Sequence, residues 1–511
     1  MSVTVEAIDP ANRDALALAD ERVEYSWNDL DPILNRAANA LHVAVDTYRR
    51  AAVFAPNSAE TALAYVACLE AGVSSVPVNF HLTVQELVYI LQDSSASVLF
   101  VGPETVEVGL AAAREADVAQ VIGWRCEAQD GLVLWEDWLA AATAETPPTD
   151  VKPLPHLHYT SGTTGKPKAT ETPPSYFPAA GTVRALAEIL RPKVTPSPGI
   201  AVGPLYHTGP LGMVRNLFAG MSLITVQSFD PEKVLALIAR YRVAGSVMVP
   251  THFQRLLSLP EEVRARYEVS SMKRLAHTGA ACPREVKKAM IDWFGPVLVE
   301  AYGGTEAGST TFITSPEWLE RPGSVGRALP PFELVIIGED GKELPRGEVG
   351  RVYFRDTTGR GIVYHGDPVK TAEAHIAPGV FTLGEMGYVD AEGYLFITDR
   401  MSDMIVSGGV NIYPAEAEHA LLRHPGVADV AVIGVPSTEM GEEVKALVIP
   451  TDPANPPSSQ DLNSFCRETL AGYKCPRSYD FVDDIGRNAM GKVNKRALRQ
   501  QYWPSDRMIG G

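Results

Sequence analysis

The amino-acid sequence predicts an α/β protein with a large N-terminal domain of α/β layers, which includes a small β-barrel-like part, and a small, mobile α+β C-terminal domain. Three observations lead to this fold class. Strand-like and helix-like segments alternate through roughly the first 300 residues, which is typical of parallel βαβ units. Short β segments with Gly and Pro turns follow from residue 323 to residue 399. A compact set of helices and strands completes the chain, so we expect domains at 1–399 and 400–511.

The first predicted layer begins with an amphipathic helix at 30–45, whose apolar residues recur at helical spacing on one face. Helices at 58–70 and 83–93 follow, and Thr83 is in the N-cap position of the second. The strands between these helices are expected at 50–55, 73–78 and 97–101.

The second layer alternates in the same way, with helices at 179–190, 231–241 and 283–294 and strands at 151–159, 199–205, 245–249, 273–277 and 297–301. Small or polar residues follow three of these strands, after positions 205, 277 and 301. Ligands bind outside the carboxyl ends of the strands in open α/β sheets. We therefore expect these three strand ends to face one crevice, close to the loop after residue 159.

The remaining elements are shorter. Strands are expected at 332–338, 350–354 and 394–398, followed by a polar, turn-like stretch at 399–407. The C-terminal domain is predicted to contain helices at 415–422 and 458–470 and strands at 427–435, 444–449 and 478–482.

Composition excludes several functional classes. The 511 residues carry a formal net charge of −17, which argues against a general binder of nucleic acid or anionic membranes. Hydrophobic residues make up 45% and charged residues 21%, as in a globular enzyme. The five cysteines form no CxxC pair, no apolar run approaches the roughly 20 residues of a membrane span, and the N-terminus does not resemble a signal peptide. We expect a cytoplasmic protein with reduced thiols and no transmembrane segment.

The most informative stretch is the loop at 159–168, which reads Tyr-Thr-Ser-Gly-Thr-Thr-Gly-Lys-Pro-Lys. Its hydroxyl and backbone N–H donors, glycines and lysines together suit the triphosphate of a nucleotide. It is not a Walker A motif, because Thr160 stands in place of the first glycine and Pro167 follows Lys166. A mobile phosphate-binding loop of another kind and a flexible surface loop are the two interpretations of its composition.

Eight landmarks in order resemble the adenylate-forming superfamily of acyl-CoA synthetases, luciferases and peptide-synthetase adenylation domains. The resemblance covers essentially the whole chain, and the stretch at 406–416 is most similar to fatty-acyl-CoA ligases. The landmarks are the loop at 161–168, PLYH at 204–207, TGA at 278–280, AYGGTE at 301–306, GEMGY at 384–388, DR at 399–400, SGGVN at 407–411 and NAMGKV at 488–493.

The resemblance implies a reaction in two halves. A carboxylate attacks the α-phosphate of ATP, which gives an acyl-adenylate and pyrophosphate. A thiol, expected to be that of CoA, then attacks the acyl carbonyl and releases AMP. Chemistry of this type depends mainly on positioning and charge neutralisation. The implied partners are a carboxylic acid, ATP, Mg²⁺ and CoA, with no nucleic acid, and a homodimer is among the assemblies that we expect.

The resemblance also implies four catalytic residues. Lys492 matches the family lysine that contacts the reacting carboxylate and the α-phosphate, and Glu306, beside Thr305, matches the glutamate that binds Mg²⁺. His207 is expected to gate or line the carboxylate site. Outside their motifs, these residues have plainer interpretations: an exposed charge for Lys492, a solvated helix start for Glu306 and a satisfied core histidine for His207.

The implied substrate-binding residues fall into four groups. The loop at 159–168 holds the β- and γ-phosphates, and 279–281 and 302–304 flank the adenine, with Tyr302 stacking on it. Two residues lie near the ribose. Residues 407–409 face the pantetheine arm after the C-terminal domain rotates. Core packing, a structural salt bridge and a tight turn are the alternatives for the last three groups. The residues are Thr160, Ser161, Gly162, Thr163, Thr164, Gly165, Lys166, Lys168, Gly279, Ala280, Ala281, Tyr302, Gly303, Gly304, Glu385, Arg400, Ser407, Gly408 and Gly409.

Three positions depart from the family pattern. Glu385 replaces the usual aspartate, Ser402 stands at a hinge position where a charged residue is usual, and Ala169 replaces a common glycine. The additional methylene of Glu385 displaces its carboxylate by about 1 Å, so we expect weakened nucleotide affinity rather than lost function. A catalytically inactive relative is the competing interpretation.

The stretch at 208–217 contains no acidic residue that could hold a substrate amine, which disfavours an amino acid. Together with Phe253, Gly303 and Gly304 it indicates an apolar pocket for a fatty, alicyclic or aromatic acid. The predicted function is that of an ATP-dependent acyl-CoA synthetase for a hydrophobic acid, with a fatty acid as the first expectation. An enzyme that loads a carrier protein and a non-catalytic nucleotide-binding relative are the alternatives.

Overall fold

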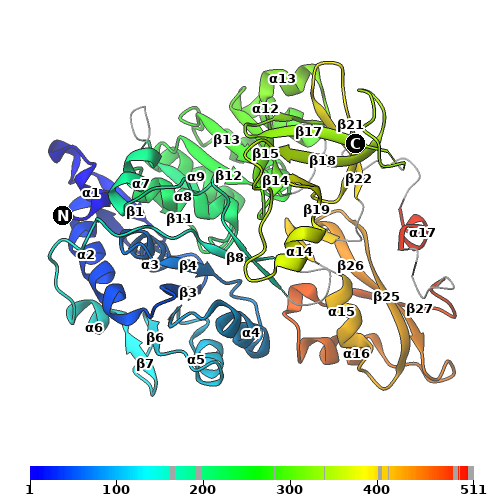
Figure 1. The fold of residues 1–511 in the computed structure, drawn as a ribbon, viewed down its shortest axis with the longest axis horizontal. Coiled ribbons are helices and arrows are strands. Elements are labelled where there is room, and N and C mark those ends of the chain that lie inside the picture. The colour runs from blue at the N-terminus through cyan, green and yellow to red at the C-terminus, as the bar shows by residue number, and fades with distance from the viewer. Residues whose placement is uncertain are drawn as a thin grey trace.

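The computed structural model describes residues 1–160, 167–191, 197–279, 282, 284–338, 340–400, 405–412, 414–486, 493 and 495–503. Its elements form the predicted mixed α/β architecture, with a large N-terminal part and a smaller C-terminal unit (Figure 1). No helix among these residues has the length and apolarity needed to cross a membrane.

The N-terminal layer is a parallel sheet in the order β4-β3-β5-β6-β7, in which the predicted alternation of strands and helices is confirmed. Its strands are β3 (Arg50–Phe54), β4 (Ser74–Pro77), β5 (Val98–Val101), β6 (Gln120–Gly123) and β7 (Leu132–Leu134). The helices that accompany them are α1 (Val3–Glu6), α2 (Trp27–Ala44), α3 (Ala59–Glu70), α4 (Val84–Ser94), α5 (Val106–Glu115) and α6 (Trp135–Ala140).

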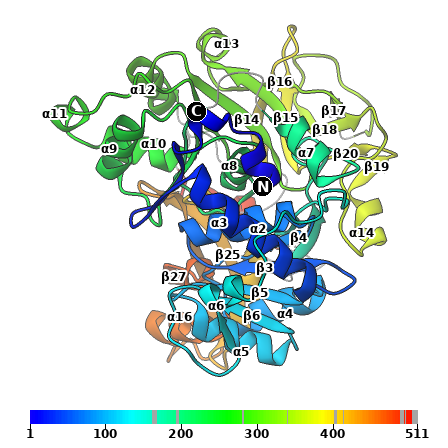
Figure 2. The ribbon, with the colours of Figure 1, turned by 90° about the vertical axis from the view of Figure 1, so that its left-hand side faces the viewer.

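The second layer belongs to a large sheet, counted as 15-stranded over the described residues. One half of this sheet carries helices along one side of the molecule, and the other half is the β-rich part on the opposite side (Figure 2). Its first strands are β1 (Leu16–Ala19), β2 (Glu24–Ser26), β10 (Gly199–Ala201), β11 (Leu223–Thr225), β12 (Gly245–Met248), β13 (Arg274–His277), β14 (Leu298–Gly304), β15 (Gly308–Thr314) and β16 (Ser324–Ala328). The helices are α7 (Val183–Leu190), α8 (Thr208–Phe218), α9 (Pro231–Tyr241), α10 (Pro250–Leu257), α11 (Glu261–Arg264), α12 (Arg284–Phe294) and α13 (Ser315–Glu320).

The β-rich part continues the large sheet with antiparallel strands, as its Gly- and Pro-rich turns predicted. These are β17 (Phe332–Ile337), β18 (Gly350–Asp356), β19 (His375–Ala377), β20 (Val380–Phe381), β21 (Glu385–Val389) and β22 (Leu395–Arg400), with helix α14 (Pro368–Glu373). Strand β8 (Leu157–Thr160) precedes the predicted phosphate-binding loop in the chain and β9 (Lys168–Glu171) follows it. The two strands pair with each other as a two-stranded antiparallel ribbon.

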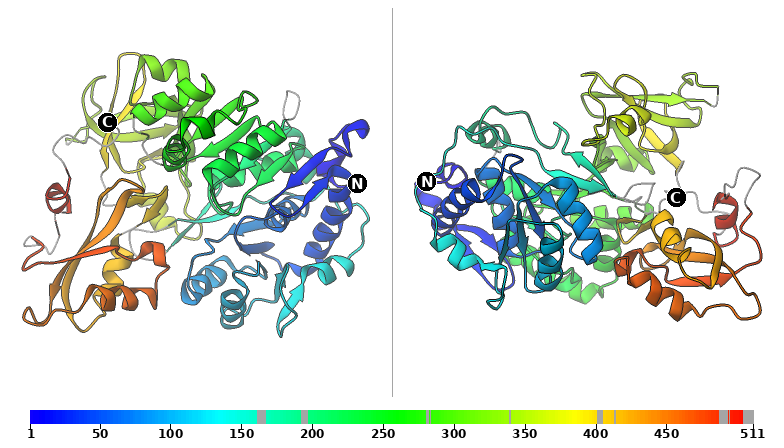
Figure 3. Two further views of the ribbon diagram at one scale, coloured as in Figure 1. Left: turned by 180° about the vertical axis from the view of Figure 1, so that it is seen from behind. Right: turned by 60° about the horizontal axis from the view of Figure 1, so that its bottom comes forward.

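The C-terminal unit has a sheet of its own, in the order β24-β23-β26-β25 with β27 beside β26. Its elements are β23 (Ile405–Ser407), β24 (Val410–Ile412), α15 (Pro414–Leu421), β25 (Val427–Ser437), β26 (Gly441–Pro450), α16 (Ser459–Arg467), β27 (Ser478–Phe481) and α17 (Lys495–Gln500). The unit lies next to both the N-terminal layer and the β-rich part, as the additional views in Figure 3 show.

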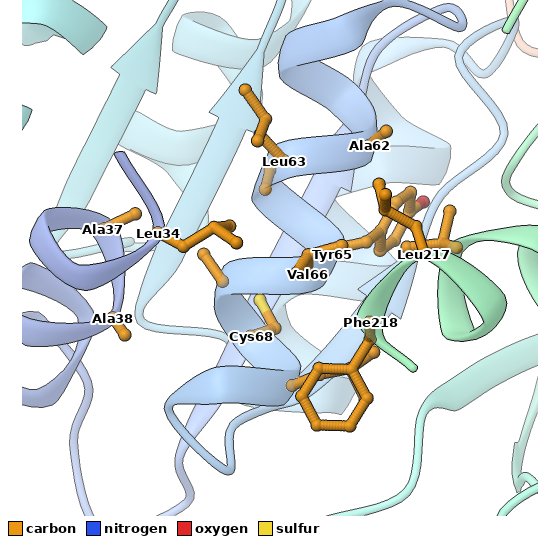
Figure 4. Packing of buried hydrophobic residues seen from close by; sticks show 14 of the residues in the cluster. Leu34, Ala37, Ala38, Ala62, Leu63, Tyr65, Val66, Cys68, Leu217 and Phe218 are labelled. Atoms are coloured by element: carbon orange, nitrogen blue, oxygen red, sulfur yellow. The ribbon is translucent and has the colours of Figure 1, made fainter. Parts of the chain in front are cut away.

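Helix α3 is buried on nearly every side because it lies between α2 and α8 (Figure 4). Small residues such as Ala62 allow its neighbours to approach, and Leu34 of α2 and Leu217 of α8 pack around it. Burial of one leucine-sized side chain stabilises the fold by about 1.5–3 kcal/mol. This apolar packing anchors one face of α8 in the core, and thereby fixes the position of its opposite face.

Proline accounts for two predicted strands that are shorter in the structure. The strand expected at 151–159 is reduced to β8, because Pro153 and Pro155 supply no backbone donor for a ladder. The strand expected at 199–205 ends at Ala201, and Pro204 follows.

Four further predictions differ from the structure. Strand β14 continues through Gly304, where the sequence predicts that it ends at 301, because it forms a hairpin with β15. Residues 405–407 form strand β23 rather than a turn, and α7 begins at Val183, after its N-cap Thr182. Helix α8 is absent from the predictions altogether, since Gly209 and Pro210 near its start are residues that disfavour helices.

Candidate active site

A cavity of about 360 Å³ lies where strand ends of the large sheet meet the C-terminal unit. The three strand ends predicted to share one crevice all line this cavity, together with residues 408–410 and 473–474 of the C-terminal unit. The predicted site residues that line it are Thr160, His207, Gly279, Gly303, Gly304, Thr305, Glu306, Gly408 and Gly409.

Two hydrogen bonds join residues that line the cavity. The hydroxyl of Thr160, at the end of β8, donates to Oε1 of Glu306 at 2.9 Å, and the hydroxyl of Thr208 donates to Thr305 at 3.4 Å. Thr305 and Glu306 lie in the tight turn between β14 and β15. A Cβ atom on Gly303 would lie 1.9 Å from the carbonyl oxygen of Gly308, so only glycine fits where the two strands approach.

Glu306 has the chemistry that a magnesium ligand requires, since Mg²⁺ is bound by carboxylate, phosphate and water oxygens. Among the described residues no three His, Cys, Asp or Glu side chains gather to hold a metal by themselves. An ion at Glu306 would therefore take most of its other ligands from the phosphates of the nucleotide and from water. Burial and Lys370 lower the pKa of the ammonium group of Lys168 on β9. The nearby carboxylate of Glu306 opposes this shift.

The residues expected near the ribose are adjacent in the sheet. Glu385 and Arg400 are partners in the register of β21 and β22, and the hydroxyl of Tyr302 donates to Oε2 of Glu385 at 2.6 Å. Neither Tyr302 nor Glu385 lines the cavity as far as the structure describes it. The carboxylate of Glu385 is thus engaged by Tyr302, a contact that sequence reasoning did not anticipate.

His207 is the N-cap residue of α8 and faces the cavity beside Tyr206, with ring centroids 4.4 Å apart. Burial lowers the pKa of His207 to about 4, so its imidazole is neutral near pH 7. It can therefore exchange hydrogen bonds with a carboxylate but cannot neutralise its charge.

The C-terminal unit supplies one wall through two consecutive glycines with positive φ, Gly408 at +57° and Gly409 at +80°. A Cβ on Gly409 would lie 3.1 Å from Cγ1 of Val249, so the backbone of this unit packs tightly against the N-terminal part. Ser407 is buried in β23, where it pairs with Val410 and with Gly441.

Two side-chain contacts join the C-terminal unit to the N-terminal layer beside this wall. Lys474 forms ion pairs with Glu86 of α4 at 2.8 Å and with Glu416 of its own unit at 2.7 Å. The amide nitrogen of Asn79 donates to the hydroxyl of Tyr473 at 2.7 Å. Burial alone lowers the pKa of Lys474, but Tyr473, Glu416 and Glu86 raise it by more, so the lysine remains charged.

Some predicted site residues lie outside the described residues: Ser161, Gly162, Thr163, Thr164, Gly165, Lys166, Ala280, Ala281 and Lys492, with the hinge residue Ser402. Their assignments stay predictions, as does the role of the Arg400 side chain. Phe253 is buried in the core and does not line the described cavity, so the expectation that it forms the acyl pocket is wrong.

The sequence analysis also missed residues that line or support the cavity. His158, Tyr176, Ser309, Tyr473 and Lys474 line it, and Arg215 of α8 lies against the ring of Tyr176 with its Cζ 5.4 Å from the centroid. For Arg215 a signal was present, because it is a lone basic residue in an otherwise apolar stretch.

Known proteins resemble this chain over nearly its whole length. A feruloyl-CoA synthase from an Amycolatopsis species is 34% identical over 498 residues, 96% of each chain. The fatty acid–[acyl-carrier-protein] ligase ScoC of Streptomyces coeruleorubidus is 33% identical over 449 residues, 85% of this chain and 83% of that protein. The structure of the amide bond synthetase McbA from Marinactinospora thermotolerans matches with a TM-score of 0.83 at 26% identity, covering 98% of this chain and 100% of that one.

Two family models match successive parts of the chain. The model of AMP-binding enzymes covers residues 6–361, and the model of the AMP-binding enzyme C-terminal domain covers residues 416–492. The chain therefore belongs to the AMP-binding enzyme family of the adenylate-forming superfamily, and is an AMP-forming acid–thiol ligase.

Proposed function

We propose that this enzyme converts a carboxylic acid with an apolar body into its CoA thioester through an acyl-adenylate. One observation carries the proposal. A single cavity is bordered by Thr160 and Glu306, the groups suited to a nucleotide phosphate, and by Gly408 and Gly409, the groups suited to a slender thiol arm. Both half-reactions can thus reach one acyl group.

In the first half-reaction, a carboxylate oxygen of the acid bonds to the α-phosphorus of ATP as the bond to pyrophosphate breaks. We assign the hydroxyl of Thr160 and the ammonium of Lys168 to binding of the phosphates, and Lys492 to contact with the reacting oxygens. Mg²⁺ held by Glu306 would neutralise phosphate charge when bound. Neutral His207 orients the acid by a hydrogen bond without forming an ion pair that would weaken its nucleophilic oxygen.

In the second half-reaction, the thiol sulfur bonds to the acyl carbon, the bond to AMP breaks, and the thiol proton passes to solvent. We propose that 400–511 is a mobile domain that turns about Ser402 between the half-reactions. The arrangement described here, with Gly408 and Gly409 at the cavity, suits this second step. Residues without side chains let a pantetheine arm pass close to the backbone.

The acid is proposed to have an apolar body, because Pro210, Val247, Met248 and Val249 line the same cavity as His207. A fatty acid of medium length is the simplest acid of this type. The relatives are named for feruloyl and fatty-acid substrates, which supports an apolar body.

A carrier-protein thiol is the second candidate acceptor, since one relative is named as a ligase for acyl-carrier protein.

We place the enzyme in the cytoplasm, which agrees with five free cysteines, four of them buried, and we propose a homodimer as its assembly.

Pyrophosphate release with ATP, Mg²⁺ and a panel of carboxylic acids tests the proposal. We expect release with at least one acid, followed by acyl-CoA formation when free CoA is the sole acceptor. Release that yields thioester only with a carrier protein would select the second candidate, and no release with any acid would reject catalysis.

A matched pair of variants controls this experiment. Glu306→Gln keeps the side-chain size but removes the charge, and should lower pyrophosphate release on the order of 100-fold, as expected for one group that stabilises transition-state charge. Glu333→Gln makes the same change in an exposed ion pair with Arg355, away from the cavity, and should leave release close to that of the unmodified enzyme.

A further inference from the structure

One part of the cavity wall is polar. His158, Tyr176 and Ser309 line it, and the hydroxyls of Tyr176 and Ser309 are 2.7 Å apart. Only one of these two hydroxyls can donate in the bond between them. The proton of the other hydroxyl is therefore left for a third partner.

Arg215 brings a positive charge close to this part of the wall. It lies on α8, one turn after Gly212, and contacts the ring of Tyr176, which lines the cavity. Its side chain turns back along the helix, so that a Cβ on Gly212 would lie 3.3 Å from Nη2 of Arg215. Gly212 thus leaves room for the guanidinium beside the ring of Tyr176.

No carboxylate within the described part of the chain pairs with this guanidinium. Burial lowers the pKa of Arg215 to about 10, and the opposing influence comes from Tyr176 alone. The group is therefore still protonated at pH 7. A largely buried cation without a counter-ion is costly, and an anion bound beside it would offset that cost.

Unpaired imidazole nitrogens add to this donor-rich environment. Nε2 of His158 and Nε2 of His156 are both buried and have no hydrogen-bond partner among the described residues. Burial, together with the nearby His207 and Arg215, lowers the pKa of His158 to about 3, so the ring is neutral and offers hydrogen bonds rather than charge. His158 itself faces the cavity.

The distance to the reacting carboxylate sets the length of the ligand. His207, at the N-cap of α8, and Gly212, beside which the guanidinium lies, are five residues apart, or roughly 7.5 Å along the helix axis. An acid that reaches from His207 to the neighbourhood of the guanidinium is thus of medium length.

We propose that the acid carries a second carboxylate at its far end, so that the substrate is a medium-length α,ω-dicarboxylic acid whose distal carboxylate is received by His158, Tyr176 and Ser309 with the Arg215 guanidinium beside them. This inference rests on the proposed function and specifies its substrate class. It keeps the apolar body proposed above and changes only the far end of the acid.

The test compares acids of matched length by pyrophosphate release. Glutarate, adipate, pimelate and suberate are each measured against the monocarboxylate with the same number of carbons, and ferulate is included as a neutral phenolic acid. We expect at least one dicarboxylate to exceed its monocarboxylate partner in kcat/KM by roughly 30-fold or more, the lower end for loss of one partner of a buried charge pair. A higher kcat/KM for a monocarboxylate or for ferulate than for every dicarboxylate would overturn the inference while leaving the proposed function intact.

Arg215→Met tests the role of the guanidinium with a side chain of similar length. The ratio of dicarboxylate to monocarboxylate kcat/KM should fall by at least roughly 30-fold, mainly through KM for the dicarboxylate. Arg240→Met removes an exposed arginine of α9 that pairs with Glu24 of β2, and should leave that ratio unchanged.

An Arg215→Met protein that keeps the same preference would overturn the inference. If this variant does not fold, as judged by its thermal transition, Ser309→Ala provides the second measurement, because it frees the Tyr176 hydroxyl and removes one donor. An unchanged ratio of dicarboxylate to monocarboxylate kcat/KM in Ser309→Ala would then reject the distal carboxylate site.

Discussion

The contact between Glu86 and Lys474 makes a sharp prediction about the second half-reaction. Glu86 lies in the first turn of α4, where its Oε2 accepts the backbone N–H of Thr83 at 2.9 Å and its Oε1 accepts from Lys474 at 2.8 Å. Glu86→Gln retains the shape and the helix cap but removes the charge that attracts the C-terminal unit. Lys474 keeps its second partner, Glu416, so no buried lysine is left without a carboxylate.

The magnitude follows from the geometry. At 2.8 Å and an effective dielectric constant of about 20, the gross attraction between the charges is about 6 kcal/mol. Desolvation and the remaining hydrogen bond offset most of it, which leaves about 1.5–3 kcal/mol for a hydrogen bond to a charged group. Since 1.4 kcal/mol corresponds to a factor of ten, the arrangement with the C-terminal unit docked should become roughly 10- to 100-fold less populated.

Single-turnover kinetics can separate the two half-reactions. Thioester formation from supplied acyl-adenylate and CoA should slow by about the same factor, while pyrophosphate release should change by less than roughly threefold, because Glu86 does not line the cavity. Asn79→Ala, which removes the neighbouring hydrogen bond to Tyr473, should act in the same direction and more weakly. Equal slowing of both half-reactions, or no change in either, would refute the reasoning.

Three further predictions concern single residues. Lys492→Ala should abolish adenylate formation yet largely spare thioester formation from supplied acyl-adenylate, and equal loss of both would contradict its assigned role. Glu385→Asp should tighten ATP binding in a calorimetric titration if the carboxylate serves the ribose; weaker binding would show that the additional methylene serves Tyr302 instead. Unfolded histidine has a pKa near 6.5 and buried His158 one of about 3, so stability should fall as pH decreases below 6.5, by up to about 1.4 kcal/mol per pH unit for this residue. Thermal melts between pH 7 and pH 5 should show a shallower decline for His158→Gln, and an unchanged slope would contradict this reading.

Elements with a clear local pattern were predictable from the sequence. Helix α9 occupies the predicted bounds because Asp230 caps its start, Pro231 begins it, and apolar residues recur on one face. Helix α8 was not predictable in this way. Pro210 is its third residue, where the missing backbone N–H has no intrahelical partner to lose, so tertiary packing of Leu217 against α3 can stabilise a helix that local propensity disfavours.

The candidate site was likewise predictable from the sequence only in part. Motif residues such as Glu306 and Gly409 could be assigned from their order in the sequence, and the structure places both at the same cavity. The partners that define their surroundings could not be assigned, because the contacts from Tyr302 to Glu385 and from Lys474 to Glu86 join residues far apart in the chain. Nothing in the local sequence records such pairs.

By itself, the sequence determined the class of chemistry, since the hydroxyl, glycine and lysine content of the loop at 159–168 and the landmarks after it require no knowledge of long-range contacts. Only the tertiary structure decided which side chains lie next to one another at the cavity. Arg215 is one basic residue in an apolar stretch. The position of its side chain depends on which face of α8 packs against the core. Because Leu217 and its neighbours pack in the core, Arg215 lies along Gly212 and beside the ring of Tyr176, which lines the cavity.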